Sequence, residues 1–243
     1  MRAYVVGVDL AAVALIVLTA RLVPVERGQL LLFGGLVLGA VLHYEASKRI
    51  ERIREVTAEG VSYVDLQSVW GFAALLLLPP PLVAAFLAIT YAHMWLRVSQ
   101  RIVVHRWVFS ANTVVLASGA AGLVLATLDS ADYPGLPAGI TGVAVVVAAA
   151  AVRWLVNYAL VVGAITLSGA PLRKAAGRPA DQLIEAAALG LGYLAALVLV
   201  VQPLAVLVLM VPLLVMQHSL MISQLQHAAS KDRTTGLLTA MYW

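Results

Sequence analysis

Residues 71–97 read GFAALLLLPPPLVAAFLAITYAHMWLR, and this stretch decides the fold class. Two apolar runs flank three consecutive prolines, Pro79, Pro80 and Pro81. A proline lacks the amide hydrogen that a helix needs and clashes with the preceding turn, so neither run can continue through them. The stretch therefore predicts two membrane helices joined by a tight turn at the far surface of a lipid bilayer.

The composition of the whole chain agrees with this prediction. Of its 243 residues, 62% are hydrophobic and 12% are charged, and the mean hydropathy is +0.95. Soluble domains average roughly 45–50% apolar and about 25% charged residues. A soluble core could not hide this excess, so lipid must cover it. The chain has no cysteine, which excludes disulfides and thiolate sites.

A spanning helix needs about 20 largely apolar residues. This length predicts an all-α polytopic membrane bundle over residues 1–226, with an uncleaved first span and about eight transmembrane helices. The predicted spans are 3–20, 28–43, 62–78, 80–97, 107–128, 136–169, 183–201 and 203–224.

Basic residues predict the orientation of these spans. With the N-terminus inside, the inner loops hold all but three of the 16 Lys and Arg residues. Only Arg21 and Arg27 then lie outside, and Arg153 lies within a span. Lys and Arg collect in cytoplasmic loops, so both termini are expected in the cytoplasm, and the protein in the inner (plasma) membrane of a bacterium. The same bias explains the net charge of +4 without a nucleic-acid partner.

The sixth span, 136–169, is too long for a single straight crossing, since its 34 positions make about 51 Å of helix. Arg153 and Asn157 interrupt its apolar run. The span could be one tilted helix, a broken helix or two short segments. Two crossings would destroy the charge bias, so one crossing is expected.

Polar side chains within the spans are the candidates for a ligand site, because ionisable groups at membrane depth are costly. They are Asp9, Asp65, His93, Arg153 and Asn157. We expect Arg153 to pair with Asp9 or Asp65 beside Asn157, since an unpaired buried guanidinium costs too much. Asp65 also follows Ser62 at helix-capping spacing, and His93 fits a position near the inner surface.

No catalytic, cofactor or metal site is expected in these residues. His43 and Glu45 are ligand types, but side chains two apart on a helix point away from each other. The chain has neither a glycine-rich phosphate loop nor a Gly-x-Ser-x-Gly motif.

Two spans are predicted to continue into the cytoplasm as helices. Residues 45–59 alternate acidic and basic side chains at ion-pairing spacing. They fit a solvated helix or a contact surface for a cytoplasmic domain. Residues 214–230 form a predicted signalling linker, because a 4-3-4-3 spacing is typical of a coiled-coil seam. The residues of this seam are Leu214, His218, Met221, Leu225 and Ala228.

The final residues, 231–243, resemble the opening of GGDEF diguanylate cyclase domains. That opening is Asp-x-Leu-Thr-Gly-Leu-x-Asn-Arg, and Asp232, Thr235, Gly236 and Leu237 match it in place. Thr234 replaces the leucine, and Thr239-Ala240 replaces Asn-Arg. The rest of the chain is similar to the membrane halves of such actinobacterial proteins. The resemblance implies that a cyclase domain, absent here, pairs with a second copy to make cyclic di-GMP.

Together these features predict a sensory or regulatory membrane module that controls the dimer geometry of a diguanylate cyclase domain. Its expected partners are the lipid bilayer, a second copy of the chain and an unknown small-molecule or lipid ligand. The alternatives are a small-molecule transporter or channel component, drawn from Arg153 and Asn157, and a membrane enzyme that acts on lipid.

Overall fold

The computed structural model describes residues 1–57, 66–97, 103–128 and 133–229, and the side chains of 1–48, 66–97, 103–128 and 133–219. Within these ranges the chain forms helices and turns without a strand, so the predicted all-α class is confirmed. The helices are α1 Arg2–Leu22, α2 Arg27–Thr57, α3 Gln67–Leu77, α4 Pro80–Arg97, α5 Val104–Leu128, α6 Gly139–Leu167, α7 Leu172–Ala175, α8 Pro179–Val201, the short 3-10 helix η1 Pro203–Ala205, and α9 Val206–Ala229.

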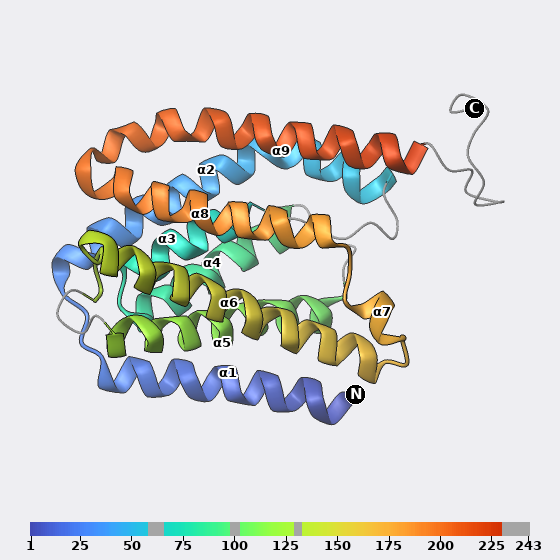
Figure 1. The fold of residues 1–243 in the computed structure, drawn as a ribbon, viewed down its shortest axis with the longest axis horizontal. Coiled ribbons are helices and arrows are strands. Elements are labelled where there is room, and N and C mark those ends of the chain that lie inside the picture. The colour runs from blue at the N-terminus through green and yellow to red at the C-terminus, as the bar shows by residue number, and fades with distance from the viewer. Residues whose placement is uncertain (58–65, 98–102, 129–132, 230–243) are drawn as a thin grey trace.

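The long helices lie roughly along one axis and form a bundle (Figure 1). On one side α1 packs on α5, and α5 packs on α6; on the other side α2 packs on α9. The N-terminus and the end of α9 lie at the same end of the bundle (Figure 1). We call this end the basic end, because it carries Arg2, Lys48, Arg97, Arg106, Arg173, Lys174 and Arg178.

Helix α3 forms the centre of the bundle. Every residue from Val69 to Leu77 is buried, and Trp70 and Phe72 are among the largest fully buried side chains. The helix has 11 residues, about 16 Å, and covers only part of the predicted span 62–78, whose residues 62–65 lie outside the description. The first described residue after this gap is Leu66, and both residues of the predicted Ser62–Asp65 cap lie outside the described residues. The apolar run serves the protein core and not a lipid-facing surface.

The predicted break at the prolines is confirmed. Helix α3 ends at Leu77 and α4 begins at Pro80, and the Pro79 carbonyl accepts the amide of Leu82 at 2.9 Å. Other parts of the protein cover this turn. Pro79 is buried, and the Gly135 amide donates to the Leu76 carbonyl at 2.9 Å, so the segment before α6 covers the turn.

Helix α6 settles the path of the sixth predicted span. It is one continuous helix of 29 residues, about 44 Å long, from Gly139 to Leu167. Arg153 and Asn157 do not interrupt it, because polar side chains project from a helix and leave its backbone hydrogen bonds intact.

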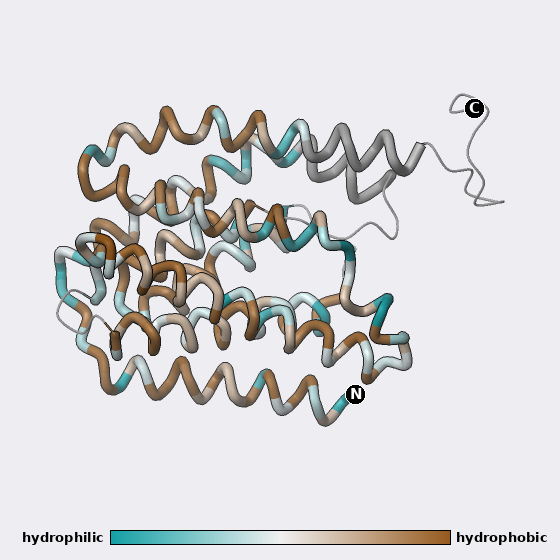
Figure 2. Tube along the Cα trace, in the orientation of Figure 1, coloured by the Kyte–Doolittle hydropathy of each residue, from teal (hydrophilic) through white to brown (hydrophobic). Residues whose placement is uncertain are grey.

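The surface has the character of a membrane protein. Leu31, Ile140 and Val201 are 83%, 84% and 79% exposed, although soluble proteins seldom expose large apolar patches. In Figure 2, hydrophobic residues line the middle of the helices and hydrophilic ones gather near their ends. Five segments of the described chain are long and apolar enough to cross a membrane: Arg2–Leu22, Arg27–Lys48, Val104–Leu128, Gly139–Leu167 and Leu172–Val201.

Both predicted helical extensions are present in the backbone. Helix α2 continues from the predicted span 28–43 to Thr57, and α9 continues past the predicted limit of 224 to Ala229. The two helices pack along each other and run towards the basic end (Figure 1).

Candidate functional site

Arg153 lies at the middle of α6 and is almost completely buried, with 4% of its side chain exposed. Its Nη1 atom is 3.5 Å from Glu185 Oε1 on α8, and the Ser68 hydroxyl of α3 donates to the same oxygen at 2.7 Å. We call these three residues the interior cluster. It joins α6, α8 and α3 and holds the Arg153 guanidinium in the interior of the bundle.

In the described residues Arg153 pairs with Glu185 and not with Asp9, one of its two predicted partners, and the other, Asp65, lies outside the description. Asp9 instead accepts a hydrogen bond from Asn112 Nδ2 at 2.8 Å, which joins α1 to α5. The reason is the order of packing, because α8 and not α1 lies against the inward face of α6 that carries Arg153. Sequence reasoning missed Glu185, although it is the only charged residue in the predicted span 183–201.

A second polar link joins α6 and α8 one residue further along. Trp154 Nε1 donates to Gln182 Oε1 at 2.8 Å, and the Trp154 ring stacks on Tyr158 with centroids 5.6 Å apart. Around this link, Arg153 Nε and Asn157 Oδ1 are buried without a hydrogen-bond partner in the described part of the chain. A guanidinium donor and an amide acceptor are therefore available to a polar group that enters the bundle.

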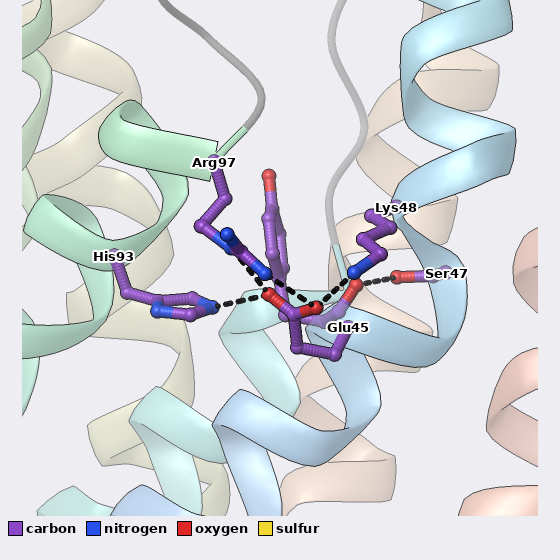
Figure 3. Close-up of polar contacts among 6 residues, drawn as sticks. Glu45, Ser47, Lys48, His93 and Arg97 are labelled. Carbon is purple, nitrogen blue, oxygen red and sulfur yellow. Dashed lines mark hydrogen bonds and ion pairs between the residues drawn. The ribbon is translucent and has the colours of Figure 1, made fainter.

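A second group of charges lies where α2 leaves the bundle, at the basic end (Figure 3). Glu45 of α2 accepts hydrogen bonds from Arg97 Nε and Nη2 of α4 at 2.9 and 3.2 Å and pairs with Lys48. His93 Nε2 of α4 is 3.2 Å from the same carboxylate. We call Glu45, Lys48, His93 and Arg97 the end cluster. His93 is thus placed near one end of the bundle and ties α4 to α2.

Among the described residues, no three His, Cys, Asp or Glu side chains come together in a group that could hold a metal ion. His43 is buried, and its Nδ1 accepts the indole hydrogen of Trp70 at 3.0 Å. This hydrogen bond joins α2 to the central helix α3.

The predicted seam of α9 can be followed only in part. Met210, Leu213 and Gln217 form the buried face of the helix. Leu214 is partly buried beside this face and His218 is exposed. The side chains of Met221, Leu225 and Ala228, and all of Asp232, Thr235, Gly236 and Leu237, lie outside the description.

The two clusters, with the groove between α6 and α8 described below, are the chemically distinctive places in the described chain. The interior cluster can recognise a polar group that enters the bundle. The end cluster can hold α2 and α4 together at the basic end or release them. Comparison of the chain with known protein families, with curated proteins and with solved structures found no match in any of the three.

Proposed function

We propose that this chain is the membrane-embedded sensory or regulatory module of a signalling protein, and that it passes a rearrangement of its bundle to the cytoplasm through α9. The observation that carries the proposal is the course of α9. This helix extends for 24 residues, from the turn after α8 to Ala229, with Pro212 in its second turn, and packs against α2 as both approach the basic end. A continuous helix transmits rotation or translation to whatever is attached to it.

The proposed orientation places the basic end in the cytoplasm, with eight crossings. Basic residues gather at this end, whereas Arg21 and Arg27 lie near the other. The absence of cysteine makes single-cysteine labelling straightforward. We expect Gln202→Cys to react with an impermeant maleimide from outside, and Ser168→Cys and Ser219→Cys to be protected. Labelling of Ser219→Cys from outside would mean that α9 does not cross.

The interior cluster supplies a place where a stimulus could act. Glu185 holds α8 against both α6 and α3, and α8 leads through Gln202 and η1 directly into α9. A ligand that binds one arrangement of α6 and α8 better than another shifts the population of the two arrangements. The resulting movement of α8 would reach α9 through this short connection.

The proposed output is a diguanylate cyclase domain beyond α9. Support comes from the resemblance of residues 231–243 to the start of that domain and from the seam of α9, which begins at Leu214. In that family two domains must face each other, so a homodimer whose α9 helices rotate would set the rate of cyclic di-GMP synthesis. Reading the gene past codon 243 is the first check of this output.

The decisive experiment is a helix-phase scan. Residues 1–230 are joined to a diguanylate cyclase domain that is active only as a dimer, and one to seven alanines are inserted after Ala229. We expect cyclic di-GMP production to rise and fall with a period near one helical turn, about 3.6 residues. The same insertions in the turn at Gly169, between α6 and α7, serve as the control and should show no period. Activity that is flat or declines steadily with insert length would contradict the proposal.

Transport of a small molecule is the second candidate, because the Arg153–Glu185 ion pair lies one helical turn from Asn157, whose Oδ1 is buried without a hydrogen-bond partner among the described residues. The unbroken course of α6 removes the broken helix on which this alternative first rested. Flux in proteoliposomes that is lost in Arg153→Leu/Glu185→Leu would favour transport.

A further inference from the structure

A groove opens on the surface between α6 and α8, which run antiparallel (Figure 1). Its volume is about 370 Å³, within the range of small-molecule sites. It is lined by apolar residues and the rings of Trp154 and Tyr193, with Phe72 of α3 among them. Small residues, among them Ala151, Ala186 and Gly190, keep it open, and a Cβ added at Gly190 would meet nothing within 4 Å.

The end of the groove at Trp154 leads to a polar and then to a basic surface. Trp154 stacks on Tyr158, whose hydroxyl donates to the Ala176 carbonyl at 3.1 Å. Residue 176 belongs to the short segment between α6 and α8, in which Arg173, Lys174 and Arg178 are exposed. Asp181 is the one acidic residue among positions 172–181, so the segment is net basic.

From the basic end towards the middle of the bundle, the order is therefore basic surface, aromatic pair and apolar groove. This order matches a phospholipid from its phosphate through the glycerol region to an acyl chain. Aromatic rings favour the membrane–water interface, and basic pockets between membrane helices bind anionic headgroups. We infer that the α6–α8 groove binds an anionic phospholipid, with an acyl chain against Trp154 and Gly190 and its phosphate at Arg173 and Arg178. The inference is independent of a cyclase output and requires only that the bundle is embedded in a membrane.

Charge complementarity selects this occupant over a helix of a second copy. The groove alone would suit either. An apolar helix, however, offers no charged partner to the three exposed basic side chains between α6 and α8, whereas a phosphodiester does.

The test titrates the full chain in mild detergent with phosphatidylglycerol or with phosphatidylcholine of the same acyl chains, and follows lipid adducts by native mass spectrometry. The wild type should bind its first phosphatidylglycerol more tightly than its first phosphatidylcholine. Gly190→Leu, which fills the groove, should weaken binding of both lipids by about tenfold or more. Arg173→Gln/Arg178→Gln should weaken only phosphatidylglycerol, by about thirtyfold, since each of the two basic residues contributes about 1 kcal/mol near an anionic surface.

Two matched controls lie elsewhere on the same protein. Gly35→Leu places the same side chain on α2, where a Cβ also meets open space, and Arg21→Gln/Arg27→Gln removes two charges at the opposite end. Both should bind lipid as the wild type does. If Gly190→Leu does not fold, Ala151→Leu fills the groove from α6. The inference is overturned if the wild type binds both lipids equally or if a groove-filling variant keeps full affinity. It is also overturned if that variant loses only dimerisation, because the groove would then be an interface between two copies.

Discussion

The interior cluster and the end cluster each contain an arginine paired with a glutamate, and the two arginines differ in exposure. Arg153 and Glu185 are 4% and 24% exposed and share one contact at 3.5 Å. Arg97 and Glu45 are 51% and 26% exposed, and Glu45 also has Lys48 and His93 beside it. The cluster with more and shorter contacts is thus the one that water and salt can reach.

The number of contacts therefore does not predict which cluster contributes more to the stability of the bundle. Removing one member of a buried pair leaves a charge in a medium that solvates it poorly. Removing one member of an exposed group leaves charges that water solvates at once. The interior cluster therefore fixes how α6, α8 and α3 pack, while the end cluster is an adjustable link between α2 and α4.

The largest effect is expected at Glu185. Glu185→Ala leaves the Arg153 guanidinium buried without its carboxylate and should lower the free energy of unfolding by about 3–5 kcal/mol. The measurement is reversible unfolding of the protein in mixed micelles, with denaturing detergent as the variable. Arg153→Leu/Glu185→Leu is the control, because it removes both charges and keeps apolar volume. It should be close to the wild type, and losses that simply add in the double variant would show that the two residues are not coupled.

A smaller effect is expected at the Asp9–Asn112 hydrogen bond, which joins α1 to α5 in a partly buried position. Side-chain hydrogen bonds between membrane helices contribute modestly, because the unfolded chain in a membrane also finds partners. A double-mutant cycle of Asp9→Ala and Asn112→Ala should give a coupling of about 1 kcal/mol. A coupling as large as that of Arg153 with Glu185 would show that the Asp9–Asn112 hydrogen bond is equally shielded from water. The expected order of the two effects would then be wrong.

Hydropathy was sufficient to place the helices, because a chain in lipid must form helices wherever long apolar runs occur. The break at Pro79–Pro80 and the continuation of α2 and α9 beyond the apolar runs followed from local rules of the same kind. Helix α3 shows the limit of this reasoning. Its run of apolar residues is equally compatible with a lipid-facing span and with the central core helix that it forms, and sequence periodicity does not distinguish the two when every position is apolar.

The candidate sites were harder to predict, because pairing depends on which helices become neighbours. The sequence predicted that Arg153 lies near the middle of its helix but did not predict its partner. Glu185 is identified as that partner only from the packing of α8 beside α6. Glu45 was predicted to form ion pairs along its own helix, and the pair with Lys48 is present. Its contacts with His93 and Arg97 cross from α2 to α4, which no local spacing encodes.

The smallest effect on stability is expected at the end cluster, and salt should reveal it. Glu45→Gln should leave global unfolding unchanged but speed amide hydrogen exchange in the last turn of α4, because Arg97 and His93 lose their anionic partner. The difference should disappear near 1 M salt, where the Debye length falls to about 3 Å and exposed charges are screened. Glu26→Gln, an exposed acid between α1 and α2, is the matched control and should change neither quantity. Global destabilisation by Glu45→Gln that persists in high salt would show that water does not replace the lost partner of Arg97, as is expected for the buried Arg153. The link between α2 and α4 would then be part of the rigid core, and the two clusters would not differ as proposed.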